Sequence, residues 1–260
     1  MGFRLSMKNE LYLEAVSDQN QASLFTKAGA WVGGSGPVKF DKVLLGPEGN
    51  PMQAALKQIG RRLTGENLPL MKVTPMAPGV TTYYAFEGQH VTLIAPPNDN
   101  YGLKVESENI LAFTQDCGYG FQILAQGVLS QKGFFTSKLT AKGPNSLVAV
   151  LSNGNPMVIK TPCMVDPDAV VCWCGPDPGL KLNLSWKNLI GQASGESYAF
   201  EFKTPGYDVL IQPFERESGL KLGVDDKRYT PSGNKAQSFK GATNELKGAF
   251  NTASKFMVMF

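Results

Sequence analysis

The side chains that could support catalysis begin with a single histidine, His90, because general acid–base chemistry near neutral pH most often uses this residue. The chain has 260 residues and no second histidine. His90 opens the run HVTLIA, whose alternation of apolar and polar residues is typical of a strand. In such a strand His90, Thr92 and Ile94 share one face. We interpret His90 as a solvent-facing strand residue and not as a catalytic base.

The thiols are the second candidates, and they belong to Cys117, Cys163, Cys172 and Cys174. Cys172 and Cys174 flank one tryptophan, which is not the spacing of a zinc site, and a lone histidine cannot complete a conventional Cys/His site. On a strand these two thiols would point to the same face. We expect buried, reduced thiols in an intracellular protein, and we predict neither a metal nor a cofactor.

Carboxylates offer a third possibility, since Glu66 and Glu196 hold equivalent places in two similar segments and could act as a pair. We expect turns to use them as hydrogen-bond acceptors for backbone amides, and the Asp166-Pro167-Asp168 turn suggests the same use. The sequence has no glycine-rich phosphate loop, serine elbow or metal cluster. We therefore predict that the protein is not an enzyme, with an enzyme of unknown class as an alternative.

Three similar segments organise the chain. Each opens with a small polar cluster, continues as alternating residues, turns at a glycine and returns as a second apolar run. The turn glycines are spaced by 64 and 63 residues, and glycine suits such turns because it has no Cβ to oppose a positive φ. A fixed period marks a repeat architecture, in which each unit buries its apolar face against its neighbours. The segments are 64–86, 130–151 and 194–214, with turn glycines Gly79, Gly143 and Gly206.

These segments predict an all-β protein made of three pseudo-repeats of a β-meander unit. The 28 glycines, 17 prolines and 18% of charged residues suit short strands joined by turns. We expect a single β-domain over residues 1–233, and one short helix over 51–63, with Pro51 at its first position. No apolar run is long enough for a transmembrane helix. The repeats are expected at about residues 24–95, 96–160 and 161–224.

Trp31 and Val32 lie between glycines, in the run KAGAWVGGSG. An aromatic side chain in that setting can pack under a neighbouring strand, or it can line a pocket. We expect packing, because large apolar side chains are mostly buried in folded proteins.

The C-terminal segment, residues 234–260, has the pattern of a helix with one apolar stripe and lysines on its polar side. It holds four of the chain's 25 basic residues and one of its 22 acidic residues, so the remaining chain is formally neutral. The stripe could dock on the β-domain, on another subunit or on an anionic membrane surface. The candidate contact residues are Phe239, Lys240, Leu246, Lys247, Phe250, Lys255, Phe256, Met257 and Phe260.

Six runs carry a family resemblance: SLFTKAGAWVGGSG (23–36), RRLTGE (61–66), ENILAF (108–113), GFFTSKLTAKG (133–143), MVDPDAVVCW (164–173) and ASGESYAFEFKTPG (193–206). Their order and spacing resemble the Altered Inheritance of Mitochondria protein 24 family. The resemblance implies a threefold pseudo-repeat of a unit similar to the tryptophan RNA-binding attenuation protein, a double-stranded β-helix type of fold. It implies no catalytic residues. The chain departs from the family pattern at Gln131-Lys132-Gly133, where Gly-Glu-Gly is typical.

We expect a non-catalytic scaffold or interaction protein that forms a homo-oligomer and can contact a membrane through its C-terminal segment. Nucleic-acid binding, argued by fold analogy, is the alternative, but a neutral body lacks the concentrated basic face that a polyanion requires. The start of the sequence lacks the basic and apolar regions of a secretory signal. We therefore expect a protein that is not secreted, and that is cytoplasmic in a bacterium or mitochondrial in a eukaryote.

Overall fold

Antiparallel strands supply the regular structure of the described residues, together with two single turns of 3-10 helix, η1 (Ser107–Asn109) and η2 (Pro167–Ala169). The predicted all-β class is thereby confirmed. The helices predicted over 51–63 and 234–260 lie outside the described residues. The computed structural model describes residues 2–18, 22–43, 70–123, 135–182 and 198–213, all within one compact unit, Met1–Ser218.

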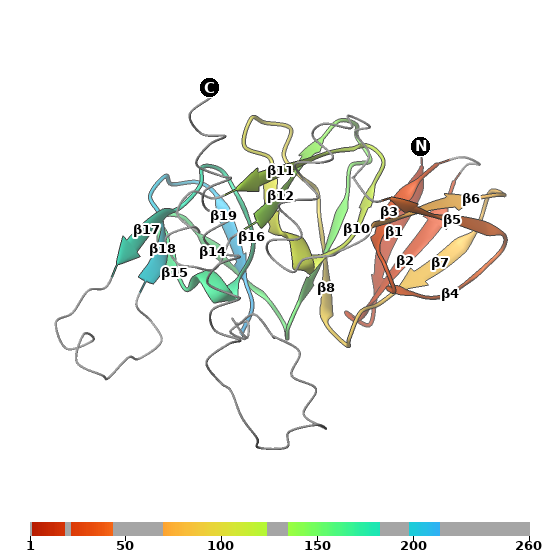
Figure 1. The fold of residues 1–260 in the computed structure, drawn as a ribbon, viewed down its shortest axis with the longest axis horizontal. Helices are drawn as coiled ribbons and strands as arrows, with labels where there is room; N and C mark the ends of the chain where they lie inside the picture. Colours follow the sequence, from red (N-terminus) through yellow and green to blue (C-terminus); the bar gives the residue numbers. More distant parts are fainter. Residues whose placement is uncertain (1, 19–21, 44–69, 124–134, 183–197, 214–260) are drawn as a thin grey trace, which may run out of the picture. The chain divides into compact units, whose positions relative to one another are not determined.

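Two sheets hold most of the strands from the N-terminal half of the chain (Figure 1). Sheet A has the order β1-β2-β7-β4, and its strands are β1 (Phe3–Lys8), β2 (Tyr12–Ser17), β4 (Trp31–Ser35) and β7 (Thr81–Tyr84). Sheet B has the order β5-β6-β3-β10-β13-β8, and its strands are β3 (Leu24–Lys27), β5 (Val38–Val43), β6 (Leu70–Pro75), β8 (His90–Ile94), β10 (Ile110–Thr114) and β13 (Val148–Ser152).

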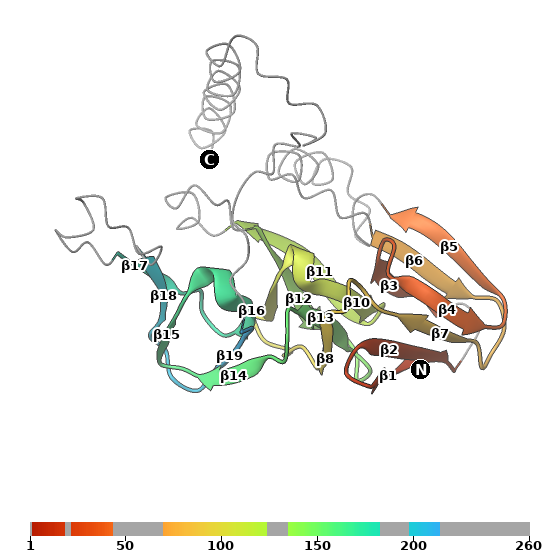
Figure 2. The same cartoon turned by 90° about the horizontal axis from the view of Figure 1, so that it is seen from below.

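The other two sheets contain the remaining strands (Figure 2). Sheet C has the order β11-β12-β9-β16-β19-β14, and its strands are β9 (Leu103–Glu106), β11 (Cys117–Ile123), β12 (Phe135–Ala141), β14 (Met157–Lys160), β16 (Val170–Cys174) and β19 (Asp208–Ile211). Sheet D has the order β15-β18-β17, and its strands are β15 (Cys163–Val165), β17 (Gly179–Leu182) and β18 (Tyr198–Phe202).

The same strand pairings occur in three consecutive sets of six strands: β2 to β7, β8 to β13 and β14 to β19. In each set the sixth strand pairs with the first and with the third. The fifth strand pairs with the second and with the fourth. Each set therefore contributes two three-stranded halves, which lie in different sheets.

A break in register recurs at the same place in each set, where the third strand pairs with the sixth. One residue of the third strand is skipped there, which is the pattern of a β-bulge. A bulge bends its strand and strengthens the local twist, so its recurrence gives the three sets a similar local curvature. The breaks lie between Trp31 and Gly33, between Ile110 and Ala112, and between Val170 and Cys172.

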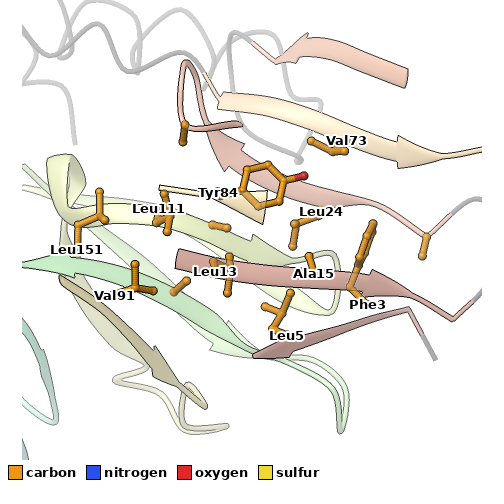
Figure 3. Close-up of a cluster of buried hydrophobic side chains, with 14 residues drawn as sticks. Phe3, Leu5, Leu13, Ala15, Leu24, Val73, Tyr84, Val91, Leu111 and Leu151 are labelled. Carbon is orange, nitrogen blue, oxygen red and sulfur yellow. The ribbon is translucent and has the colours of Figure 1, made fainter. Parts of the chain in front are cut away.

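Apolar clusters fill the spaces between successive sheets. The first cluster joins strands of sheets A and B around the buried Tyr84 (Figure 3). A second cluster joins sheets B and C, and it includes a stack of Phe25, Phe113 and Tyr119 with ring centroids 5.2 Å apart in both pairs. A third joins sheets C and D around Trp173. Sheets B and C are covered on both faces, which explains why every residue of β10 and β13 is buried.

The predicted β-meander is wrong in one respect, because the two strands that flank each turn lie in different sheets. β6 and β7, β12 and β13, and β18 and β19 are separated in this way. The alternating pattern shows which residues face inward, but it cannot show which sheet a strand joins. Gly79 and Gly206 have the expected positive φ, 72° and 91°. Gly143 does not adopt a positive φ, so its turn does not require glycine for that reason.

In each set, the hydroxyl of a serine or threonine makes hydrogen bonds to the turn that precedes the sixth strand. The backbone N–H of Val80, Leu147 and Tyr207 donates to the hydroxyl of Ser17, Thr114 and Thr161, over 3.1, 3.1 and 2.9 Å. The carbonyls of the same three turn residues accept the backbone N–H of the Ser or Thr, at 2.9, 3.0 and 3.0 Å. Each hydroxyl also donates to a nearby carbonyl, that of Ala77, Asn145 or Tyr207.

Removing one of these hydroxyls should destabilise the protein. Thr114→Val keeps the shape of the side chain but leaves the N–H of Leu147 without its partner. We expect a loss of about 1–3 kcal/mol in the free energy of unfolding, measured by urea denaturation. Thr92→Val is the control, because the hydroxyl of Thr92 makes no hydrogen bond among the described residues. An equal loss in the free energy of unfolding for Thr114→Val and Thr92→Val would show that the hydrogen bonds of the Thr114 hydroxyl do not stabilise the fold.

Candidate interaction surfaces

His90 is not a solvent-facing residue as predicted. Only 14% of its side chain is exposed, and its Nε2 lies 3.6 Å from a carboxylate oxygen of Glu10. The turn between β1 and β2 covers this end of β8, since the N–H of Val91 donates to the carbonyl of Glu10 over 2.8 Å. The Nδ1 atom of His90 is buried without a hydrogen-bond partner in the described part of the chain. This arrangement fits a packed histidine that holds the N-terminal hairpin against sheet B.

A shallow hollow of about 360 Å³ lies beside this histidine, and Gln89 and Asn153 form its polar floor. The amide nitrogen of Gln89 donates to the side-chain oxygen of Asn153 over 2.7 Å, whereas the side-chain oxygen of Gln89 is buried without a hydrogen-bond partner in the described residues. Glu87 is the one titratable residue of its lining. With a single carboxylate and no nucleophile, the hollow offers no evident acid–base pair. Its lining residues are Glu87, Gly88, Gln89, Asn153, Gly154 and Pro213.

The four cysteines form no disulfide in the structure; Cys117 and Cys172 are buried as predicted, whereas Cys163 and Cys174 are only half-buried, so the prediction of buried thiols is wrong for these two. Cys172 and Cys174 lie on β16 and both contact the core cluster between sheets B and C. Burial raises the pKa of the Cys117 thiol above its ordinary value, and burial does the same at Cys172. A raised pKa keeps a thiol protonated near neutral pH, and a protonated thiol is a poor nucleophile and a poor metal ligand.

Lys104 on β9 is a buried cation, and the groups around its Nζ stabilise the positive charge. Its Nζ donates to the carbonyl of Gly175, lies 3.3 Å from a carboxylate oxygen of Asp177, and lies 5.3 Å from the centroid of the Tyr101 ring. Burial lowers the pKa of Lys104, and the carboxylate of Asp177 opposes that shift. A buried ammonium with a carbonyl and a carboxylate partner is a structural group that ties the loop after β16 to sheet C.

The carboxylates follow the sequence prediction where they can be described. The side chain of Asp166 accepts the backbone N–H of Asp168 over 2.8 Å at the start of η2. Glu66 and Glu196 lie outside the described residues. Within the ranges that the structure describes, no group of three or more His, Cys, Asp or Glu side chains could hold a metal ion.

The predicted contact residues of the C-terminal segment, Phe239 to Phe260, all lie outside the described residues. The described part of the chain nevertheless presents other apolar contact residues. Seven of the eleven large apolar residues that are exposed lie on strands that end a sheet, and two of these strands, β4 and β15, form the candidate surfaces described next.

The first surface is the unpaired edge of β4, which we call the β4 edge. Trp31 and Val32 are 48% and 52% exposed, so the prediction that they pack under a neighbouring strand is wrong. The Trp31 ring instead contacts the ring of Phe40 edge-on at 5.6 Å. The physical reason is the position of β4, which pairs with β7 on one side and ends sheet A on the other. An unpaired row of N–H and C=O groups on such a strand can accept another strand.

The second surface is the free edge of β15, the β15 edge. β15 pairs with β18 on one side and ends sheet D on the other. Met164, in the middle of this strand, is 48% exposed. Sequence patterns did not identify Met164, because β15 has three residues and is too short for an alternation to be read. The absence of any charged residue from both β4 and β15 is the one sequence signal that could have indicated an unprotected edge.

These features define the class of the protein: an antiparallel β-protein of packed sheets in which two sheet-ending strands, β4 and β15, carry exposed apolar residues and no charge. The chain belongs to the family described as Mitochondrial biogenesis AIM24, which matches residues 6–214. This confirms the family that the sequence runs suggested.

Among solved structures, the crystal structure of a protein from Streptococcus pyogenes is similar in fold, with a TM-score of 0.58 and 16% sequence identity. The match covers 82% of this chain and 93% of that chain. No curated protein matches the sequence. Within the described residues, no helix has the length and apolar character needed to span a bilayer.

Proposed function

We propose that this chain is a non-catalytic scaffold or interaction protein that associates with copies of itself. The observation that carries the proposal is that seven of the eleven exposed large apolar side chains of the described residues lie on strands that end their sheets. Natural proteins usually protect such edges with charged residues, and exposed apolar patches mark contact sites. Each of β1, β4, β5, β14 and β15 ends a sheet and carries one or more of these residues: Met7, Trp31, Val32, Phe40, Met157, Val158 and Met164.

The proposal includes a threefold repeat as the basis of the scaffold. The three six-strand sets share their pairings, and each has a bulge in its third strand. We take each set as one copy of a β-module, with the boundaries Tyr12–Tyr84, His90–Ser152 and Met157–Ile211. A module of this kind buries its apolar faces against its neighbours, and the outermost modules are left with uncovered faces. Those faces are the natural place for self-association.

The family's description, mitochondrial biogenesis, suits a protein that organises other components, in mitochondria or in the cytoplasm of a bacterium. Membrane contact through residues 234–260 is a second part of the proposal. Its support is the sequence pattern of apolar residues and lysines in that segment.

Self-association is tested by the molar mass of the full chain, measured by light scattering during size-exclusion chromatography. We expect a single species whose mass is a multiple of 28.1 kDa. A species of 28.1 kDa across the micromolar range would contradict the scaffold role.

Membrane contact is tested by vesicle flotation, which compares the full chain with a chain ending at Gly233. Each of four lysines near an anionic lipid surface contributes about 1 kcal/mol, and the apolar stripe adds to this. We therefore expect the full chain to float with phosphatidylserine vesicles and the shortened chain to stay at the bottom. Vesicles of phosphatidylcholine alone are the control for charge. Equal flotation of the two chains would exclude the C-terminal segment as a membrane contact.

A further inference from the structure

The first strands of the three six-strand sets, β2, β8 and β14, differ in what lies on their outer edge, the edge that faces away from the sixth strand. β1 pairs with β2 along the full length of that edge. At β8 the backbone N–H of Val91 donates to the carbonyl of Glu10, in the turn between β1 and β2, over 2.8 Å. β14 ends sheet C, and Figure 2 shows no described strand beyond it. We call this unpaired side of β14 the β14 edge.

β2 and β14 are equivalent strands, and their hydrogen bonds align them residue by residue. Ser17 and Thr161 each accept the backbone N–H of the following turn on their hydroxyl, at 3.1 and 2.9 Å. Their carbonyls accept the N–H of the turn glycines Gly79 and Gly206, at 2.9 and 3.4 Å. Counting back from these two residues gives the equivalent pairs: Leu13 and Met157, Glu14 and Val158, Ala15 and Ile159, Val16 and Lys160.

The cover that β1 supplies accounts for a difference in burial between the two strands. Leu13 is fully buried in the cluster between sheets A and B, and Leu5 of β1 belongs to the same cluster. Met157, the equivalent of Leu13, is 58% exposed, and Val158 beside it is 56% exposed. Met157 therefore has the apolar character of a covered position without the cover.

The hydrogen bonds of Thr161 show which backbone groups belong to the β14 edge. Its N–H donates to the carbonyl of Tyr207, on the side of β19. Backbone groups of neighbouring residues in an antiparallel strand point to opposite sides. The N–H and C=O groups of Val158 and Lys160 therefore point away from β19. Such a row of groups at the end of a sheet can accept a further strand.

We propose that the β14 edge binds an extended segment of a partner protein, which pairs antiparallel with β14 in the place that β1 takes on β2. In this mode of strand addition, main-chain hydrogen bonds supply the affinity and alternate side chains supply the specificity. The contact is separate from the self-association proposed above, because its occupant is a different protein.

The register of β1 defines the apolar side chains of the occupant. β1 places Leu5 and Met7 beside the core-facing residues of β2. In the same register, the corresponding residues of the occupant lie beside Ile159 and Met157. Ile159 packs against the cluster between sheets C and D, so apolar residues at both positions extend a core and leave water. The residue between them faces the exposed Val158 and is apolar as well.

Lys160 sets the charge preference of the β14 edge, because it is the one charged residue of β14. Its side chain is 76% exposed, and its Nζ lies 2.5 Å from a carboxylate oxygen of Asp208 on β19. An ammonium has three donors, so a carboxylate of the occupant can share it, whereas a basic residue is repelled. In the β1 register this position of the occupant corresponds to Arg4. β1 of a second copy is therefore a poor occupant, and it already pairs with β2.

The test uses a fluorescein-labelled peptide with blocked ends, Ser-Phe-Glu-Leu-Val-Met-Ser, which follows β1 with Glu in the place of Arg4 and Val in the place of Ser6. Fluorescence polarisation should show saturable binding to the full chain. Val158→Pro removes an outward N–H and no bond to β19, and edge strands tolerate proline at such a position. We expect binding to weaken about tenfold or more. Val158→Thr is the control, because it keeps the N–H and the β-branched shape.

A second pair of measurements leaves the protein unaltered, so it decides the question even if Val158→Pro folds poorly. N-methylation of the peptide valine blocks an N–H that faces β14, and it should abolish binding. N-methylation of the peptide leucine blocks an N–H that points away, and it should leave binding unchanged. Lysine in place of the peptide glutamate should weaken binding, because it meets Lys160.

The outcomes separate this proposal from self-association. A peptide that does not bind, or that binds equally well after either N-methylation, would overturn the β14 edge as an acceptor. A fall in the molar mass of the chain with Val158→Pro would make a second copy the occupant and overturn the partner segment. A chain of 28.1 kDa that binds the peptide as expected would contradict self-association and leave the β14 edge standing.

Discussion

Trp173→Ala should lower the free energy of unfolding by about 3–5 kcal/mol, the range for truncating a buried aromatic side chain. Trp173 is fully buried. It forms a cluster with Phe200, Phe202 and Val209 between sheets C and D, and its ring meets the ring of Phe202 at 6.0 Å. The substitution removes this contact area and leaves a cavity that the two packed sheets cannot close. Urea denaturation followed by circular dichroism measures the loss.

Two further variants make this prediction specific. Tyr12→Ala removes an aromatic side chain of β2 that is largely exposed, so we expect a loss of about 1 kcal/mol or less. Trp173→Phe should cost less than Trp173→Ala, because it keeps a ring and removes an indole N–H that has no hydrogen-bond partner among the described residues. Losses of similar size in Trp173→Ala and Tyr12→Ala would show that the cluster is not a core.

The sequence predicted the strands better than their arrangement. Alternation located the strand in the run HVTLIA, residues 90–95, which the structure has as β8 (His90–Ile94). The distribution of strands over sheets depends on pairings between residues far apart in the chain, such as Phe25 with Phe113. A local pattern does not contain that information, and so a strand-turn-strand run was expected to form a single meander.

The errors at individual residues have the same origin. His90 was expected to face solvent, but the hairpin turn at Glu10 covers it. Trp31 was expected to be buried, but β4 ends its sheet. In both cases a local pattern gives the face of the strand, whereas a distant element decides what covers that face. Ser17, Thr114 and Thr161 were missed because a hydroxyl that fastens a turn has no fixed sequence distance from it.

The structure adds an asymmetry that the sequence comparison of segments does not reveal. The described residues hold three sets of six strands, joined by the pairing of β3 with β10 and of β9 with β16, while β4 and β15 end their sheets. A repeat protein normally covers such ends with polar capping elements. Here the β4 edge and the β15 edge keep exposed apolar residues, Trp31, Val32 and Met164, and lack charges. These two edges are therefore the candidate surfaces for the self-association that we propose.

Val32→Glu should convert the self-associated protein to a folded monomer of 28.1 kDa. In the described unit Val32 is exposed, so a carboxylate at this position remains hydrated and the fold should be unaffected. Val32 holds the bulge position of its set, and the residues at the same position in the other two sets, Leu111 and Val171, are buried. We expect a contact between copies at the β4 edge to bury Val32 as well. Burying an unpaired carboxylate at the β4 edge costs several kcal/mol, and we expect this cost to dissociate an assembly that uses this edge. Light scattering during chromatography measures the mass, and thermal unfolding monitors the fold.

Matched variants decide whether the effect belongs to the β4 edge and the β15 edge. Val32→Thr keeps the β-branched shape without adding a charge, and it should retain most of the assembly. Lys39→Glu adds negative charge to the edge of β5 and should leave the mass unchanged. Met164→Glu places a carboxylate on the β15 edge, the second candidate surface, so it should also dissociate the protein, and it keeps the test informative if Val32→Glu folds poorly. An unchanged mass in both glutamate variants would mean that copies meet elsewhere, because neither edge could then lie in the contact.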